Sequence, residues 1–270
     1  MTAAVGDPSL RVRLGYGIGI YGPMLGWVAG IQYLLYFYTD VAGIDPTRAG
    51  IIFMAGMVWD AISDPLTGYL ADRTHTRWGR YRPYLLFGAA PFGLSVFLVF
   101  STPSGTSDSA VFWYAMLTSL LFRTAYTVVY MPFTAMIARM TMDYDARMSL
   151  TASKTMFTTL ANLTISVFFF LLVIRLGGGD EAQGFSRAAA VAGALGALTT
   201  WICFAATREG AIPARTSSRA GFGFAATMGG VRHLLSNRAF VFLFLGVATF
   251  GGFYGMCLSS VVYVAKYWLG

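Results

Sequence analysis

The sequence contains few charged residues. Asp, Glu, Lys and Arg together make up 11% of its 270 residues, whereas hydrophobic residues make up 56%. A soluble domain has about 25% charged residues, so the composition argues against a soluble protein and favours one that lies in a membrane. The abundance of glycine and phenylalanine, at 31 and 22 residues, suits closely packed membrane helices with aromatic, lipid-facing surfaces.

Cysteine and histidine are also scarce, with two residues of each. Cys203 and Cys257 both lie in apolar runs and have no partner at the spacing of a metal or redox site, so we interpret them as packing residues. We recognise no nucleophile–base pair, phosphate-binding loop or metal cluster. We therefore expect no enzyme and no cofactor.

Seven apolar runs approach or exceed the ~20 residues that a membrane-spanning helix needs. The predicted spans are Leu14–Tyr38, Thr47–Ala71, Pro83–Ser101, Ala110–Ala138, Leu150–Ile174, Ala188–Ala206 and Ala239–Tyr267. The first run is too long for the apolar part of a signal peptide, so we expect it to remain as a spanning helix.

The positive charges are unevenly distributed between the two sides of these spans. Of the 19 Lys and Arg residues, fourteen fall on the side of the N-terminus, four fall on the other side, and Arg123 lies within a span. Positive residues favour the cytoplasmic side. We therefore expect a multi-pass protein of the plasma (inner) membrane with a cytoplasmic N-terminus, and the net charge of +7 needs no nucleic-acid partner.

The long segment before the last span suggests the domain organisation. Residues 1–206 are predicted to form a six-helix bundle, 207–238 a cytoplasmic linker rich in Gly, Ser and Thr, and 239–270 one further helix. Six helices, a linker and one helix predict the first half and one helix of a twelve-helix parent, truncated in this chain. A seven-helix receptor is disfavoured by the N-terminus on the inside and by Lys266, which lies at the end of its span.

Two carboxylates lie within the second span. Asp60 and Asp64 are four residues apart and therefore share one helix face. Carboxylates inside a membrane are costly and mark functional sites. With Ser63 or another hydroxyl they offer hard oxygen ligands for a sodium ion, or a carrier for a proton. The alternative is a stabilising pair with an arginine or lysine.

The fourth span presents Arg123, Thr127 and Tyr130 on one face, which should point into the bundle. Arg123 either pairs with one of the two acids of the second span or contacts an anionic group of a substrate. Lys154 lies near the cytoplasmic end of the fifth span, where it either snorkels to the lipid headgroups or contributes to a site.

The loop after the second span is the strongest candidate for a gate. Asp72 can accept hydrogen bonds from the N-terminal end of a neighbouring helix, while arginines of the loop pair with acids across the bundle. Plain anchoring of positive charge at the cytoplasmic surface is the alternative. The candidate gating residues are Gly68, Asp72, Arg73, Arg77, Gly79 and Arg80.

At these residues the sequence resembles a known family. Gly68 to Arg80 resembles the loop motif of the major facilitator superfamily, and the strings Trp59–Pro65 and Trp78–Pro83 resemble the glycoside–pentoside–hexuronide:cation symporters. Weaker matches run along the rest of the chain, which corresponds to the first half of a family member plus one helix. They are Tyr16-Gly17-x-Gly19, Tyr36-x-Tyr38-Thr39-Asp40, Pro132-Phe133 and Tyr267–Gly270.

The resemblance implies two six-helix bundles with alternating access around a midplane cavity. It also implies sugar uptake coupled to sodium, lithium or a proton. By position, Asp60 and Asp64 match the family's cation-site acids, and Thr127 matches a hydroxyl of that site. Ser63 stands where a well-known sugar carrier of the family has Asn.

The sugar site departs from that carrier. Met24 and Tyr130 stand where it has two sugar-binding acids, Lys154 replaces an arginine, and Arg123 replaces a glycine. The loss of two acids and the gain of a cation lead to the hypothesis of an anionic substrate such as a uronic acid or glucuronide. Stacking of Tyr130 on a sugar ring would also allow a neutral glycoside.

We therefore predict an all-α membrane protein of the major facilitator type that performs sodium- or proton-coupled symport of a glycoside or uronide. One alternative is an amphiphile or lysolipid carrier of the same fold, with a lateral opening lined by Phe168 to Phe170. Another is a fragment that does not transport by itself. The expected partners are a small-molecule substrate and membrane lipid, and the full-length protein is expected to be a monomer.

Overall fold

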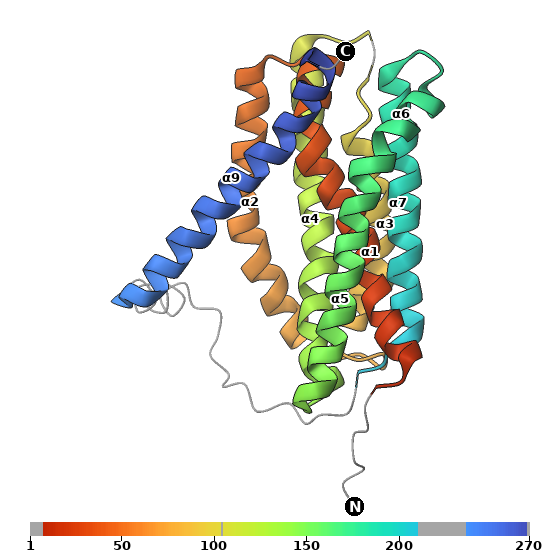
Figure 1. Cartoon of the computed structure of the whole chain (residues 1–270), viewed down its shortest axis with the longest axis vertical. Coiled ribbons are helices and arrows are strands. Elements are labelled where there is room, and N and C mark those ends of the chain that lie inside the picture. Colours follow the sequence, from red (N-terminus) through yellow and green to blue (C-terminus); the bar gives the residue numbers. More distant parts are fainter. Residues whose placement is uncertain (1–7, 104, 210–235, 269–270) are drawn as a thin grey trace, which may run out of the picture. The chain divides into compact units, whose positions relative to one another are not determined.

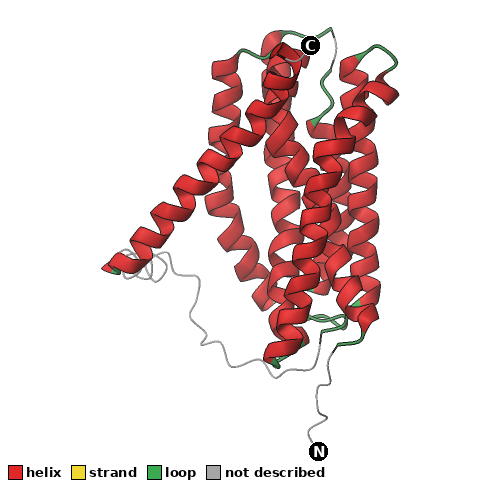
Figure 2. Cartoon of the chain, viewed as in Figure 1, coloured by secondary structure: helices red, strands yellow, loops and turns green. Residues whose placement is uncertain are grey.

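The computed structural model describes residues 8–103, 105–209 and 236–268, and the regular structure of these residues is helical (Figure 2). The chain divides into two units, residues 1–210 and 211–270. The first unit contains the helices shown in Figure 1 as α1 to α7. The predicted linker lies mostly outside the described residues.

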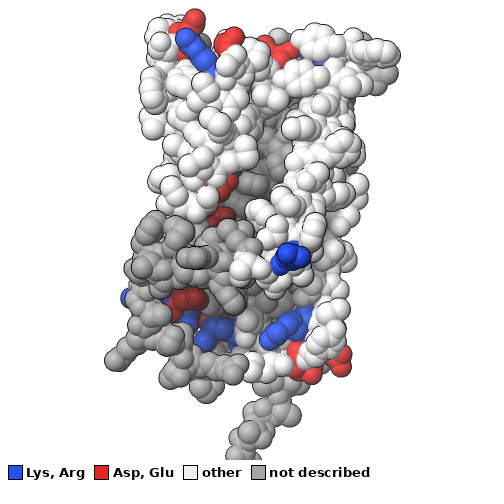
Figure 3. Space-filling view, turned by 90° about the vertical axis from the view of Figure 1, so that its left-hand side faces the viewer, with Lys and Arg blue, Asp and Glu red and all other residues white. Residues whose placement is uncertain are grey.

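Seven stretches of the described residues are long and apolar enough to cross a membrane, which confirms the seven predicted spans. They are α1 with the π-helical turn after it (Leu10–Val41), α2 (Pro46–Arg73), α3 (Arg82–Val99), α4 (Asp108–Met140), the stretch of α5, a π-helical turn and α6 (Tyr144–Gly177), α7 (Glu181–Ala206) and α9 (Arg238–Trp268). Charged side chains in the view of Figure 3 lie mostly toward the top and the bottom of the picture.

Local sequence explains where several helices begin and end. Asp45 caps α2, because its carboxylate accepts hydrogen bonds from the backbone N–H groups of Thr47 and Arg48 at 2.9 and 3.3 Å. Asp143 and Asp180 cap α5 (Tyr144–Thr164) and α7 in the same way. Gly178 follows α6 (Phe170–Gly177) with φ of +60°, a left-handed conformation that commonly ends a helix.

Helix α1 occupies the interior of the first unit. It packs against α7, α5 and α4, while α3 packs against α7 and α4. At one end of this core, four phenylalanines form an aromatic cluster: Phe37 in the turn after α1, Phe100 directly after α3, Phe169 in the turn before α6, and Phe185 in α7, all with 1% exposure or less. Helix α2 packs mainly against α4 alone, so much of its surface lies outside the core.

Candidate functional site

Two polar contacts link the middle of α2 to α4. The Arg123 guanidinium forms a close ion pair with the Asp60 carboxylate through Nη1 and Oδ2. The Thr127 hydroxyl donates to Asp64 Oδ1 at 2.7 Å. Asp60 and Asp64 are four residues apart on α2, and Arg123 and Thr127 are four residues apart on α4. The two contacts therefore lie one helical turn apart along the interface between the two helices, which we call the α2–α4 seam. Of the alternatives for Arg123, the structure shows the ion pair with an acid of α2.

The neighbouring residues fix this seam. Trp59 Nε1 donates to Thr124 Oγ1 at 2.8 Å, which adds a third hydrogen bond between the two helices. The Arg123 and Asp60 side chains are 13% and 25% exposed, so their ion pair is partly shielded from solvent. Ser63 is buried, and its hydroxyl oxygen has no hydrogen-bond partner among the described residues.

Three aromatic rings form a continuous stack beside the seam. Trp27 of α1 stacks on Tyr126 of α4, with ring centroids 4.4 Å apart and an interplanar angle of 17°. Tyr126 in turn stacks on Tyr130 at 5.0 Å and 14°. Arg123 Cζ lies 5.9 Å from the Trp27 ring centroid, and Lys154 Nζ lies 5.8 Å from that of Tyr130. We call these three rings the aromatic column. It has a cation at each end.

The position of Lys154 corrects a predicted helix boundary. The apolar run predicts that the fifth span begins at Leu150, which places Lys154 one turn inside the helix. The structure begins α5 at Tyr144, after the Asp143 cap, so Lys154 is ten residues into the helix. Its ammonium group lies over Tyr130. The first turns of α5 are polar, so the hydropathy of the sequence does not reveal that the helix begins there.

Met24 lies on α1, three residues before Trp27, and its side chain is buried. Its weakly accepting thioether cannot grip sugar hydroxyls as a carboxylate would. Phe168 to Phe170 do not share one environment either. Phe169 belongs to the buried aromatic cluster, whereas Phe168 is exposed, so these residues do not together line a lateral opening.

The loop between α2 and α3 folds back on itself. The Tyr81 phenol, directly before α3, donates to Asp72 Oδ1 at 2.7 Å. Burial raises the pKa of Tyr81 to about 12, and the hydrogen bond and negative charge of Asp72 act in the same direction. Asp72 therefore contacts a side chain beside the helix N-terminus, and not the backbone amides of that terminus.

Glu209 takes the position at the α3 N-terminus. The backbone N–H groups of Arg80, Tyr81 and Arg82 donate to its two carboxylate oxygens at 2.8, 2.7 and 2.9 Å. Such amides at a helix start lack intrahelical acceptors and carry partial positive charge. The Glu209 side chain is 4% exposed, and Arg139 Nε lies 3.8 Å from Oε2. Sequence reasoning missed this residue.

A signal for Glu209 exists in the sequence, because it is the only acidic residue between Thr207 and Asn237. Gly79 also allows Glu209 to approach the N-terminus of α3. Its φ of +115° favours glycine, and a Cβ there would lie 2.7 Å from Glu209 Cδ. Gly68 differs, because a Cβ at that position would meet nothing within 4 Å.

The arginines of the predicted gate make local contacts. Arg73 lies over the Tyr69 ring at 4.2 Å, and Arg77 lies over the Trp78 ring at 4.5 Å. Arg80 Nη2 and the imidazole of His75 are 3.3 Å apart. Pairing of these arginines with acids across the bundle stays a prediction.

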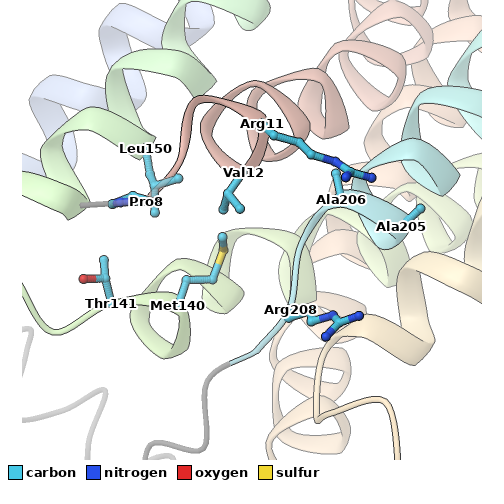
Figure 4. Close-up of a pocket in the computed structure, with 9 residues that line it drawn as sticks. All are labelled: Pro8, Arg11, Val12, Met140, Thr141, Leu150, Ala205, Ala206 and Arg208. Carbon is cyan, nitrogen blue, oxygen red and sulfur yellow. The ribbon is translucent and has the colours of Figure 1, made fainter. Parts of the chain in front are cut away.

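A separate cavity lies where α1 begins and α4 and α7 end (Figure 4). Its volume is about 410 Å³, and Arg11 and Arg208 contribute its charged side chains. None of the predicted cation-binding or substrate-binding residues lines it. The lining residues are Pro8, Arg11, Val12, Met140, Thr141, Leu150, Ala205, Ala206 and Arg208.

The chain is similar to named membrane carriers. It is 37% identical over 201 residues to the "Putative glycoside/cation symporter YagG" of Escherichia coli, a match that covers 74% of this chain and 44% of that protein. It is 31% identical to the "Isoprimeverose transporter" of Lactiplantibacillus pentosus, over 77% of this chain and 45% of that protein. It is also 31% identical to the "Glucuronide carrier protein homolog" of Escherichia coli, over 76% and 45%.

The chain thus spans a little under half the length of these relatives. The profile of the MFS/sugar transport protein family matches residues 15–270, nearly the whole chain. The names of the relatives confirm the resemblance that the second-span and loop residues carry. The chain belongs to the MFS/sugar transport protein family, among the glycoside–pentoside–hexuronide:cation symporters.

Proposed function

We propose that the whole protein is a secondary active transporter of the plasma (inner) membrane, with its N-terminus in the cytoplasm. It couples the movement of a glycoside or uronide to that of sodium or a proton by alternating access. The observation that carries the proposal is the pair of mid-span carboxylates, Asp60 and Asp64, that face α4 and contact Arg123 and Thr127. Acids at this depth are typical of ion pathways in transporters. The working unit is a monomer.

The coupling ion binds at the α2–α4 seam. Asp60, Asp64, Thr127 and Ser63 supply carboxylate and hydroxyl oxygens, which are the ligands that hard cations prefer and the groups that can carry a proton. The unpaired Ser63 hydroxyl supports its inclusion, since buried polar groups normally have partners.

The substrate binds beside the aromatic column. Tyr130 offers a ring face for stacking on a sugar, and Lys154 lies over the same ring. Because Arg123 already pairs with Asp60, Lys154 is the cation that receives a substrate carboxylate, and Met24 supplies an apolar wall. This arrangement favours a uronide, and the relatives include a glucuronide carrier homolog.

Uptake by cells that express the natural protein tests the proposal. Wild-type protein should accumulate a glycoside or uronide under an imposed sodium or proton gradient, and Asp64→Asn should abolish the accumulation. Asp108→Asn is the matched control, because Asp108 is exposed at the start of α4 and should retain uptake. Undiminished accumulation by Asp64→Asn would contradict the proposed ion site.

Substrate competition tests the role of Lys154. Lys154→Met should raise the apparent KM for a uronide roughly tenfold, or about 1.4 kcal/mol, and change the KM for the matching neutral glycoside far less. Equal changes for both sugars would assign Lys154 to positioning alone. Preference of the wild type for the neutral sugar would exclude a uronide as its main substrate.

A further inference from the structure

The cavity of Figure 4 lies where three membrane spans begin or end. Helix α1 begins at Leu10, α4 ends at Met140 and α7 ends at Ala206, and residues beside all three ends line the cavity. The ends of spanning helices lie at the level of the lipid headgroups. The volume of about 410 Å³ is typical of a small-molecule site. The cavity is therefore placed where a headgroup or a small solute can enter it.

Two arginines give this cavity its charge. Arg11 lies in the first turn of α1, and Arg208 lies two residues after the end of α7. Both residues are exposed, and neither guanidinium has an ion-pair partner among the residues that the structure describes. The Arg11 side chain extends toward Ala206, on the side of the cavity where Arg208 lies (Figure 4). Two such guanidiniums can bind an anion that has several oxygen atoms.

The acidic residues next to this cavity are engaged elsewhere. Glu209 follows Arg208 directly, but its carboxylate accepts the three backbone N–H groups at the start of α3, and its side chain is 4% exposed. Asp143 caps α5 by accepting from the Ala146 backbone N–H at 3.1 Å. Within the described part of the chain, no acidic side chain lines the cavity. The positive charge of Arg11 and Arg208 is thus not neutralised locally.

Neighbouring groups make the cavity more favourable for an anion. Arg13 Nε donates to the Pro8 carbonyl oxygen at 2.8 Å, and Arg147 Nη2 donates to that of Thr141 at 3.3 Å. Both carbonyls belong to lining residues, so arginines bind acceptor groups that would otherwise repel an anion. The first N–H groups of α1 carry partial positive charge, and the Ser9 side chain does not cap them.

We propose that this cavity binds a phosphate group, which accepts hydrogen bonds from the guanidiniums of Arg11 and Arg208. Basic pockets between membrane helices bind the headgroups of anionic lipids in this way. The apolar side chains of Val12, Met140 and Leu150 line the rest of the cavity and can contact the carbon atoms attached to the phosphate. The phosphate belongs either to an anionic phospholipid or to a soluble phosphate compound.

This site is separate from the α2–α4 seam and the aromatic column, so its test does not require transport. The purified natural protein is heated in a non-ionic detergent with increasing amounts of phosphatidylglycerol, and Tm is measured. A ligand that binds only the folded state raises Tm. We expect a rise of a few degrees in wild type, and a clearly smaller one with phosphatidylcholine, whose headgroup has no net charge. Equal rises with the two lipids would overturn the inference.

Variants of the two arginines locate the site. Arg11→Gln/Arg208→Gln should raise the phosphatidylglycerol concentration for half of the effect roughly tenfold, because two charge-assisted contacts are lost. Arg73→Gln/Arg77→Gln is the matched control. It removes the same charge from exposed residues of the loop between α2 and α3, outside the cavity, and should keep the wild-type response. An equal weakening in both double variants would assign the effect to surface charge and overturn the inference.

A third variant tests the cavity without changing its charge. Ala205 is exposed and lines the cavity, so Ala205→Phe should occupy part of its volume and weaken the response to phosphatidylglycerol while both arginines remain. An unchanged response in a folded Ala205→Phe protein would exclude this cavity as the site.

Inorganic phosphate distinguishes the two sources of the ligand. It is compared with chloride at equal ionic strength, in wild type and in Arg11→Gln/Arg208→Gln. A rise of Tm in wild type alone, with competition against phosphatidylglycerol, supports the site and assigns it to soluble phosphates. A response to phosphatidylglycerol without one to inorganic phosphate supports the site and assigns it to a lipid headgroup. No response of wild type to either compound would overturn the inference.

Discussion

The α3–α7 seam and the α2–α4 seam are built on opposite principles. At the first, Gly93 and Gly193 bring two helix backbones into contact, and a Cβ at Gly93 would lie 2.6 Å from the Gly193 carbonyl oxygen. At the second, the helices are linked by an ion pair and by hydroxyl hydrogen bonds. In the most apolar stretch of each span, 44% of the residues are buried in α3 and 50% in α7, compared with 22% in α2 and 44% in α4.

This difference distinguishes the helices that stabilise the bundle from the helices that carry the candidate site. Close backbone packing through small residues is how membrane helices associate without a hydrophobic driving force, and it leaves no freedom for side chains to exchange partners. Polar contacts between partly exposed side chains can open and re-form at modest cost. We therefore assign the α1–α3–α7 core to holding the bundle together and the α2–α4 seam to ion binding.

The largest expected effect on stability comes from adding a methyl group at the α3–α7 seam. Gly193→Ala places a Cβ against the Gly93 backbone and should destabilise the protein by about 3 kcal/mol, because neither helix can shift without disturbing the core. Thermal unfolding in detergent measures this. Gly50→Ala in α2 is the control, since its Cβ would meet nothing within 4 Å. Equal effects of the two substitutions would remove the contrast between the seams.

The next effect concerns the ion pair. Asp60→Asn leaves the Arg123 guanidinium without its counter-charge and should destabilise the protein by roughly 1–3 kcal/mol, reduced by the partial exposure of Asp60. Adding Arg123→Gln should recover part of the loss, because the double variant has no unpaired charge. A double-mutant cycle on Tm gives the coupling. Additive losses would show that the two side chains do not interact.

A smaller effect on stability is expected where Glu209 caps α3, at the end of the loop between α2 and α3. Glu209→Gln keeps one acceptor oxygen but loses the negative charge and should cost about 1 kcal/mol. Hydrogen exchange at the backbone amides of Arg80 to Arg82 should accelerate, since these amides donate to the carboxylate. Glu181→Gln, which changes the carboxylate beside Tyr36, should leave those amides unchanged. Slow exchange in Glu209→Gln would rule out the cap.

The smallest expected effect is the pH dependence of the stability that the Asp45 cap gives to the N-terminus of α2. Backbone N–H groups, Arg48 first, hold the pKa of Asp45 below its usual range. The cap therefore stabilises the folded state at neutral pH, and this contribution is lost as the pH falls below about 4, through the lowered pKa. Hydrogen exchange at Thr47 and Arg48 across this range measures it. Asp45→Ala should exchange quickly at every pH, whereas Asp108→Ala should retain the wild-type profile.

Much of the fold could be predicted from the sequence because the apolar runs are long and the loops are charged. All seven spans are present. The shared face of Asp60 and Asp64 also followed from helical spacing, and so did that of Arg123 and Thr127. The spacing could not decide whether Arg123 meets an acid or a substrate, because the choice depends on how α4 is placed against α2.

Other features depend on contacts that a linear pattern does not carry. Helix α5 begins at Tyr144 because Asp143 caps it, and a hydropathy pattern does not detect a helical turn made of polar residues. Trp27 joins the aromatic column only through packing of α1 on α4. Glu209 meets backbone amides more than 120 residues earlier in the chain, so only the folded bundle reveals its role.

The most direct test of the account compares two transport modes in liposomes that contain the natural protein with Asp64→Asn. If the α2–α4 seam carries the coupling ion, the variant should exchange labelled for unlabelled substrate across the membrane at a rate near that of wild type. It should fail to accumulate substrate under an imposed proton or sodium gradient. Accumulation equal to that of wild type would contradict the assignment of ion coupling to this seam.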